Sequence, residues 1–510
     1  MLLHEVLGFD RIDDGAGDRA VLVPADGGPG MSLAQIRRHA AATAARLGEL
    51  GVRPGERIAI LGEKTPEVVA AFLGASLAGA VYVPLDPAAG SAYWSRLLED
   101  LEIRVLLARD PGMVGDLAPV RAVALPIFGT RETTPQFAQS PHILPASRSE
   151  NDPAYVLPTS GSTGAPKGVV LSHLNALAFV RWAADAVELG PGDTVLNVAP
   201  FHFDLSVFDI YASLLRGARL VLAPPEAAMF PGELINAIED HGVTVLYTVP
   251  TVLRLLLDAG AFADGAGRTL RTIMYAGEPF PVPALRRLMA VLPHVTVHNF
   301  FGPTETNVCL AERLRAAPSS DEAEVPIGVP ASEARIVLVD EHGAPVGDGE
   351  AGEILVDGPT VMLGYQTASG FAPAARPFRT GDFALRSASG SLLFRGRRDD
   401  MVKVRGQRIE LKAVERVLER VPGVAEAAAL AAGDQLVAYV AARKGLEEAA
   451  LRSACRTSLP PGSMPHRFLL VEDFPRLSNG KLDRRRLAAE AAKPARSKGA
   501  PAAGDASGRR

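Results

Sequence analysis

The chain has few cysteines, few aromatic residues and no excess of basic charge. Its 510 residues include two cysteines and two tryptophans, and Phe, Trp and Tyr together make up 6%. The cysteines, Cys309 and Cys455, lie far apart and form neither a disulfide framework nor a metal-binding spacing, which is typical of the reducing cytoplasm. The net charge of −5 argues against binding to nucleic acid or to an anionic membrane.

Long hydrophobic runs are also missing. No stretch approaches the roughly 20 apolar residues that cross a bilayer, and the N-terminus, Met1–Val6, lacks the features of a signal peptide. Residues 489–510 are rich in Ala, Gly, Pro, Ser and charge, which predicts a disordered tail. With 47% hydrophobic and 22% charged residues, the chain as a whole is typical of a globular protein with two or three domains.

Short apolar runs alternate with longer helical patterns over most of the first 300 residues. Arg57–Leu61 is typical of a strand, Glu67–Gly79 has helical spacing, and Ala80–Leu85 is again strand-like. The same alternation returns between Thr194 and Tyr247. It predicts an α/β fold, in which parallel sheets carry helices on both faces.

The pattern changes twice in the second half of the chain. After Val325, short alternating runs separated by Gly, Pro and Asp predict an antiparallel sheet or barrel. Charge and glycine are concentrated at 396–406, which predicts a linker between a core of residues 1–397 and a smaller unit. Residues 401–488 are enough for a small α+β domain.

The most informative motif lies between Tyr155 and His173. A loop from Thr159 to Gly168 combines glycines, hydroxyl side chains and Lys167 between two apolar segments. Glycines let backbone N–H groups approach a ligand, and the hydroxyls and the ammonium group suit a polyphosphate. The loop is not a Walker A sequence, because its glycines and lysine have the wrong spacing. A flexible surface loop is the alternative, and the flanking Thr-Ser and Pro-Lys-Gly disfavour it.

This loop resembles the phosphate-binding loop of the adenylate-forming enzymes, which include acyl-CoA synthetases, luciferases and the adenylation domains of nonribosomal peptide synthesis. The resemblance covers about residues 30 to 487 and includes motifs at 301–306, 378–382, 396–411 and 475–484. It implies a large N-terminal domain with a small β-barrel-like subdomain, joined by a hinge at 398–400 to a mobile C-terminal domain. The residues that would bind ATP by this resemblance are Thr159, Ser160, Gly161, Ser162, Thr163, Gly164, Lys167, Gly277, Glu278, Pro279, Asn299, Phe301, Gly302, Asp382 and Arg397.

The motif Phe301–Thr306 follows a strand-like stretch, and loops that leave parallel strands bind ligands in open α/β sheets. Glu305 offers a hard oxygen to Mg²⁺, and Thr304 offers a hydroxyl to a phosphate. Taken alone, the motif could equally be a Gly-Pro turn with a solvated glutamate. By the resemblance, Glu305 holds the metal, Phe301 stacks on adenine and Asn299 binds the base edge.

Two further motifs supply the ribose contacts and the catalytic lysine. In the family, residues matching Asp382 and Arg397 hold the ribose. Lys481 follows an Asn-Gly turn, where a lysine is usually solvated. The family match instead makes Lys481 catalytic, because its ammonium would offset the repulsion between a carboxylate and the α-phosphate that it attacks. The residue matching Asp399 is the hinge about which the small domain swings between adenylation and thioester formation.

The substrate signal is Asp204, within the aromatic run Phe201–Asp209. A carboxylate is costly there without a cationic partner, although capping of the next helix is an alternative role. In amino-acid-activating relatives, the aspartate of a Phe-Asp-x-Ser segment pairs with the substrate ammonium group. The side chains that would line the pocket by the same resemblance are Asp204, Leu205, Phe208, Tyr247, Met274, Ala276, Phe300, Val308 and Cys309, together with Lys481.

This lining is mostly apolar and bulky, which favours a small amino acid. L-Proline fits, and the lining is similar to that of stand-alone L-prolyl-AMP ligases that load a carrier protein in natural-product biosynthesis. D-Alanine is the nearest competitor. The chain has no Gly-Gly-x-Ser carrier segment, so a separate carrier protein with a phosphopantetheine thiol is expected. An acyl-CoA ligase and a non-catalytic nucleotide-binding protein remain as alternatives.

Overall fold

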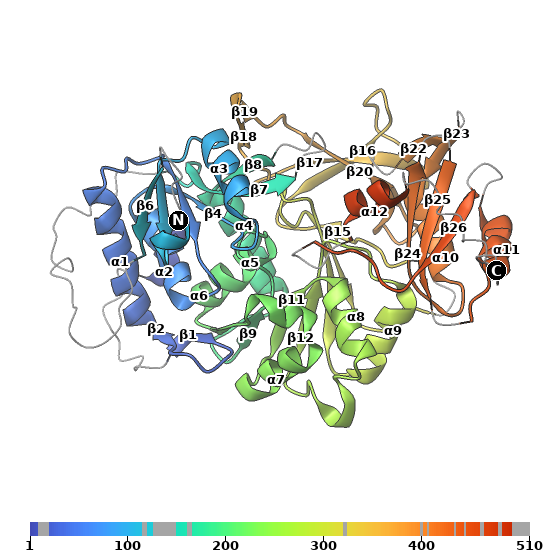
Figure 1. Ribbon diagram of the computed structural model, residues 1–510, viewed down its shortest axis with the longest axis horizontal. Coiled ribbons are helices and arrows are strands. Elements are labelled where there is room, and N and C mark those ends of the chain that lie inside the picture. The colour runs from blue at the N-terminus through green and yellow to red at the C-terminus, as the bar shows by residue number, and fades with distance from the viewer. Residues whose placement is uncertain are drawn as a thin grey trace, which may run out of the picture. The chain divides into compact units, whose positions relative to one another are not determined.

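The computed structural model describes residues 1–8, 20–114, 120–125, 149–160, 166–319, 324–397, 401–404, 407–432, 435–442, 445–459, 464–477 and 482–491. The chain divides into two compact units, a larger one that runs to Arg395 and a smaller one that begins at Gly396 (Figure 1). Each unit has a hydrophobic core of its own. The two units are therefore described separately.

A nine-stranded sheet forms the centre of the larger unit, in the order β15-β14-β13-β12-β11-β9-β10-β1-β2. Its strands are β1 (Ala20–Pro24), β2 (Met31–Ser32), β9 (Thr194–Asn197), β10 (Arg219–Leu222), β11 (Val245–Thr248), β12 (Thr272–Tyr275), β13 (Thr296–Phe301), β14 (Leu310–Leu314) and β15 (Val329–Pro330). The six strands from β13 to β1 are parallel, and antiparallel strands flank them at both edges.

Strand residues of this sheet alternate between two buried faces. On β9, Val195 joins one apolar cluster and Leu196 joins another; on β11, Leu246 and Tyr247 divide in the same way. One face packs on α7 (Pro231–His241), α8 (Pro250–Asp258) and α9 (Val282–Val291). Burial of both faces explains why these strands are continuous apolar runs.

A second sheet of eight strands has the order β19-β18-β8-β7-β4-β3-β5-β6. Its strands are β3 (Arg57–Leu61), β4 (Val81–Pro84), β5 (Val105–Ala108), β6 (Arg121–Ala124), β7 (Pro153–Ser160), β8 (Pro166–Ser172), β18 (Gly364–Thr367) and β19 (Gly370–Pro373). The helices α1 (Leu33–Glu49), α2 (Pro66–Leu77) and α4 (His173–Ala186) share one core cluster with strands of both sheets. Helix α3 (Ser91–Asp100) packs on the other face of the second sheet.

The remaining strands form three smaller sheets. Strands β16 (Arg335–Val339), β17 (Ala351–Asp357), β20 (Phe378–Arg386) and β21 (Leu392–Arg397) form a four-stranded sheet after Val325, where the sequence predicts antiparallel strands. The smaller unit contains the pair β22 (Met401–Val404) and β23 (Gln407–Glu410) and a sheet of β24 (Val424–Ala432), β25 (Gln435–Ala442) and β26 (Arg467–Val471). Its helices are α10 (Leu411–Glu419), α11 (Glu448–Ser458) and α12 (Arg484–Ala491).

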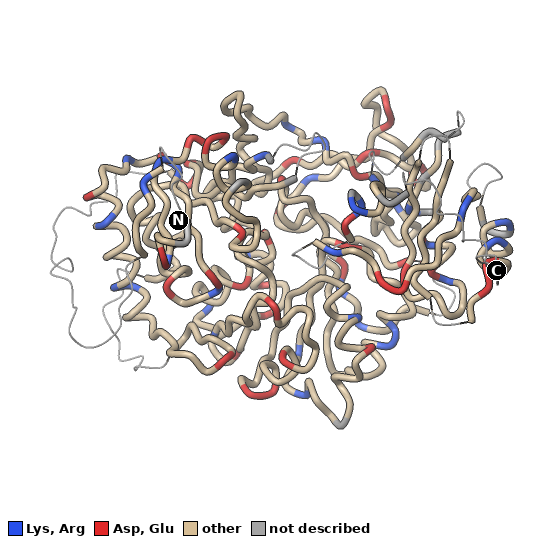
Figure 2. Tube along the Cα trace, in the orientation of Figure 1, with Lys and Arg blue, Asp and Glu red and all other residues tan. Residues whose placement is uncertain are grey.

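The predicted alternation of strands and helices is confirmed in detail. Strand β3 has the predicted bounds, and α2 begins one residue earlier than predicted because Pro66 occupies its first turn. Acidic and basic residues are interspersed along the described part of the trace (Figure 2). None of the described helices is long and apolar enough to cross a membrane.

Candidate active site

Two motifs that are a hundred residues apart in sequence meet at the carboxyl edge of the nine-stranded sheet. The segment with Asp204 follows β9, and the segment with Thr304 follows β13. Thr304 Oγ1 donates a hydrogen bond to Asp204 Oδ2 at 2.7 Å. The Asp204 side chain makes no capping bond to the short helix α5 (Leu205–Val207), so the helix-capping alternative is wrong.

Ser206 explains the spacing of the Phe-Asp-x-Ser segment. Its Oγ lies 2.7 Å from the carbonyl oxygen of Phe203 and 3.2 Å from that of Phe201. The side chain therefore closes the turn on which Asp204 lies. A local side-chain bond of this kind holds the backbone in a turn before the helix starts.

Aromatic rings form a wall next to Asp204. Phe208 and Phe300 each pack edge-to-face on Tyr247, with both pairs of ring centroids 5.8 Å apart. Burial raises the pKa of Tyr247 well above its ordinary value, and the nearby charge of Asp204 adds to that shift. The carboxylate is thus close to a buried aromatic surface, where a cationic partner is worth more than in water.

Most of the other predicted pocket residues belong to the same hydrophobic core cluster as these three rings. Met274 is the register partner of Tyr247 on the neighbouring strand, and both are buried. Ala276 and Val308 also belong to this cluster, and Leu205 packs at its edge.

Cys309 does not share this wall. It packs in the separate core cluster of the four-stranded sheet, and its Sγ lies 3.6 Å from the carbonyl oxygen of Phe301. Burial raises the pKa of its thiol to about 12. The group therefore stays protonated and is no nucleophile at neutral pH.

A second group of predicted residues meets around Tyr365. The Lys167 ammonium lies 4.8 Å from the centroid of the Tyr365 ring, and Tyr365 Oη donates to Glu305 Oε1 at 2.6 Å. Pairing of β18 with β8 brings Tyr365 to this position. No motif in the sequence marks Tyr365, because its role depends on the contact between two distant strands.

The β7–β8 hairpin carries the predicted phosphate-binding loop. Thr159 is the register partner of Lys167, and Ser160 is the partner of Pro166, so the hairpin closes directly beside Lys167. Gly161, Ser162, Thr163 and Gly164 lie outside the described residues, as do Asp399 and Lys481.

The loop after β13 is tightly folded. A side chain at Gly302 would place its Cβ 1.6 Å from the carbonyl oxygen of Asn307, so only glycine fits there. Asn299 donates through Nδ2 to the carbonyl oxygen of Pro326 at 2.7 Å. The Phe301 ring is tilted against Phe394, with centroids 5.6 Å apart.

The other predicted ATP contacts are on separate elements. Asp382 is buried on β20, and Arg397 is the last residue of β21. Gly277 has a left-handed backbone with φ of 84° after β12. Glu278 accepts a hydrogen bond from Thr251 Oγ1 at 2.7 Å, and Pro279 is exposed.

The residues present fit a Mg²⁺ ion that arrives with a polyphosphate. In the part of the chain that the structure describes, no group of three or more His, Cys, Asp or Glu side chains could hold a metal. Mg²⁺ is commonly bound by one or two carboxylates together with substrate phosphates rather than by an all-protein cage. Glu305, oriented by Tyr365, is a suitable single carboxylate.

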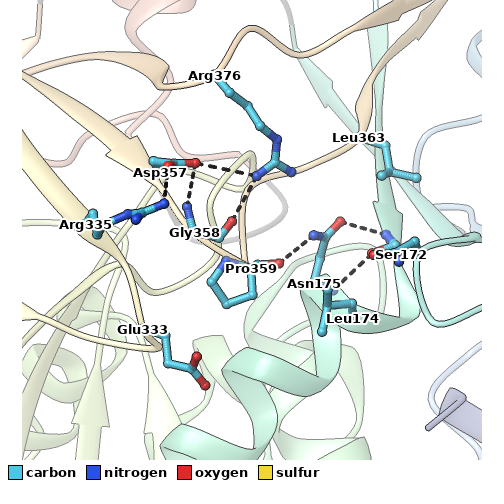
Figure 3. Close-up of a pocket in the computed structure, with 11 residues that line it drawn as sticks. Ser172, Leu174, Asn175, Glu333, Arg335, Asp357, Gly358, Pro359, Leu363 and Arg376 are labelled. Atoms are coloured by element: carbon cyan, nitrogen blue, oxygen red, sulfur yellow. Dashed lines mark hydrogen bonds and ion pairs between the residues drawn. The ribbon is translucent and has the colours of Figure 1, made fainter.

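A surface cavity of about 550 Å³ lies elsewhere in the larger unit, beside the first turn of α4 (Figure 3). Arg335 and Arg376 both pair with Asp357 there, at 2.7 and 3.7 Å. Asn175 donates to the carbonyl oxygen of Pro359 at 2.6 Å, as Figure 3 shows. Among the residues that the structure describes, no site residue predicted from the sequence lines this cavity, and both arginines pair with Asp357.

Comparison with known proteins finds similar sequences and structures over most of the chain. The chain matches the family model described as AMP-binding enzyme over residues 9–366, and the model described as AMP-binding enzyme C-terminal domain over residues 413–481. An L-proline--[L-prolyl-carrier protein] ligase from Pseudomonas fluorescens is 40% identical over 87% of this chain and 91% of the relative. A ligase of the same name from Streptomyces coelicolor is 36% identical over 90% and 92%. The crystal structure of ATP-bound MatB from Rhodopseudomonas palustris superposes with a TM-score of 0.81 and 25% identity, over 96% of this chain and 99% of that one.

Proposed function

Because this chain belongs to the family of AMP-binding enzymes, we propose that it activates L-proline with ATP and transfers it to a separate carrier protein. The observation that carries the proposal is the Asp204 carboxylate, which accepts a hydrogen bond from Thr304 next to a buried aromatic wall. A fatty or aryl acid has no cation for this carboxylate. The two relatives named as L-proline carrier-protein ligases support the choice of substrate.

In the first half-reaction, an oxygen of the amino acid carboxylate attacks the α-phosphorus of ATP. A C–O–P linkage forms, the bond to the bridging oxygen breaks, and pyrophosphate leaves, so that prolyl-AMP remains. Asp204 binds the substrate ammonium, and Phe208, Tyr247 and Phe300 exclude water from the ring. Lys481 offsets the charge that develops between the two anions. Mg²⁺ near Glu305 would neutralise phosphate charge.

In the second half-reaction, the thiolate of phosphopantetheine attacks the acyl carbon. A thioester forms, and AMP leaves with the pair of electrons from the broken C–O bond. The domain of residues 401–488 turns about Asp399 between the two steps, relative to the core of residues 1–397. Hinge closure of this kind lets one enzyme assemble two sites in sequence.

Amino-acid-dependent pyrophosphate exchange tests the substrate. The panel contains L-proline, D-alanine, glycine and L-pipecolate, with Mg²⁺ and ATP held constant. We expect L-proline to give the highest kcat/KM, and a higher value for any of the others would reject it. Comparison of free CoA with a holo-carrier protein as acceptor then separates a carrier ligase from an acyl-CoA ligase.

A further inference from the structure

A buried polar cluster lies at the carboxyl end of β9. Lys64 Nζ donates to the carbonyl oxygens of Asn197 at 3.1 Å and Val198 at 2.9 Å. The exposed fraction of Lys64 is 8%, and those of Asn197 and Asp209 are 0%. Lysine and aspartate are rarely buried to this extent unless they are paired.

The cluster joins the two ends of the segment that carries Asp204. Asn197 Nδ2 donates to Asp209 Oδ2 at 2.8 Å and to the carbonyl oxygen of Ala199 at 3.1 Å. Asn197 is the last residue of β9, and Asp209 lies in the π-helical turn Phe208–Ala212. Asp204 lies between these tethered ends.

Two acceptor atoms of this cluster lack a donor. Asn197 Oδ1 and Asp209 Oδ1 are buried and have no hydrogen-bond partner among the described residues. The amide cannot be flipped to correct this, because Nδ2 already donates to two acceptors. An acid and an amide can form a cyclic pair of two hydrogen bonds, in which a single proton on the acid gives a partner to the second oxygen of each group.

The surroundings of Asp209 favour the neutral acid. Burial raises the pKa of Asp209 to about 8, although Asn197 and Lys64 oppose the shift. Burial likewise lowers the pKa of Lys64 to about 7. Among the described residues, the exposed Glu226 also interacts with Lys64, and Tyr247 of the aromatic wall interacts with Asp209 on one side and Asp204 on the other.

We propose that Asp209 is held as a neutral carboxylic acid paired with Asn197, and that this pair and Lys64 position the Asp204 segment to receive the substrate ammonium group. The inference rests on the proposed function for its link to the substrate. All three are positioning residues, because they act through the segment between β9 and the π-helical turn.

Two substitutions at Asp209 test the pairing. Asp209→Asn replaces the acid–amide pair by an amide–amide pair with the same two hydrogen bonds, so we expect the KM for L-proline at pH 7 to stay close to wild type. Asp209→Leu leaves Asn197 unpaired, and we expect it to raise that KM by roughly tenfold or more while the KM for ATP is unchanged. Glu226→Gln, an exposed acid near Lys64, is the control and should have no effect.

An ionised Asp209 that compensates a charged Lys64 gives a different result. Asp209→Asn would then leave a buried ammonium without a counterion, and activity would fall as far as in Asp209→Leu. That outcome overturns the proposal, and so does an unchanged KM in Asp209→Leu.

An infrared measurement makes the test independent of the substrate. The spectrum of wild type minus that of Asp209→Asn should contain the C=O stretch of a protonated carboxylic acid at pH 7. A carboxylate band in its place contradicts the pairing. If wild type shows no L-proline-dependent exchange, the proposed function fails, whereas the infrared band still reports on Asp209.

Discussion

Asp204→Asn is the most informative single substitution, because it removes one charge and almost no volume. Thr304 Oγ1 can still donate to the amide oxygen at position 204, so we expect the segment to keep its structure. The substrate ammonium loses its counterion in a site with an aromatic wall. Removal of one partner from a buried ion pair costs about 3–5 kcal/mol.

The lower end of this range applies, since Asp204 is only half-buried. A loss of about 3 kcal/mol corresponds to a decrease of roughly 100-fold in kcat/KM for L-proline. Pyrophosphate exchange at varied L-proline measures the decrease, and calorimetric titration with ATP should show unchanged nucleotide affinity. Asp204→Ala should abolish exchange.

A substrate analogue separates the charge pair from a general loss of activity. Tetrahydrofuran-2-carboxylate has the ring of proline without the ammonium, so wild type should discriminate strongly against it. In Asp204→Asn this discrimination should shrink, because both compounds then lack the ion pair. Equal discrimination in the two enzymes, or a kcat/KM for L-proline within a few-fold of wild type, would refute the role of Asp204.

Three further changes test other parts of the site. Tyr365→Phe frees Glu305 from its hydrogen bond, so exchange should need several-fold more Mg²⁺ at an unchanged KM for L-proline; an unchanged Mg²⁺ titration would contradict this. Gly302→Ala should abolish exchange, because the new Cβ clashes with the carbonyl oxygen of Asn307. Gly232→Ala, where the new Cβ meets no atom within 4 Å, should leave exchange unchanged. Asp209 keeps its proton up to about pH 8 in the folded protein, whereas the unfolded chain loses it near pH 4. Between pH 5 and 7 the free energy of unfolding of wild type should therefore fall with pH, by up to about 1.36 kcal/mol per pH unit more than that of Asp209→Asn. Urea unfolding at each pH measures this, and parallel curves for the two proteins would be inconsistent with the raised pKa.

The sequence predicts local features of this fold well. The run Arg57–Leu61 is a strand with the predicted bounds, since a strand buried on both faces has apolar residues at successive positions, here Ile58 to Leu61. The α/β class follows from the same alternation. For Asp204 the sequence left two roles open, and the structure excludes capping because the carboxylate accepts a hydrogen bond from Thr304 and makes no capping bond.

Features that depend on distant contacts could not be predicted. Tyr365 reaches Glu305 only because β18 pairs with β8, about two hundred residues earlier in the chain. Lys64 and Asp209 have no spacing that links them, and only burial at the end of β9 reveals their cluster. Val308 and Cys309 are adjacent in sequence, yet they pack in different clusters, which a motif cannot distinguish.

Formation of the mixed anhydride can be observed directly by mass spectrometry. Purified protein incubated with ATP, Mg²⁺ and L-proline should yield a species with the mass of prolyl-AMP, together with one pyrophosphate per adenylate, and omission of the amino acid should abolish both. If no aminoacyl adenylate forms with L-proline or with any other small amino acid, the chain does not activate amino acids.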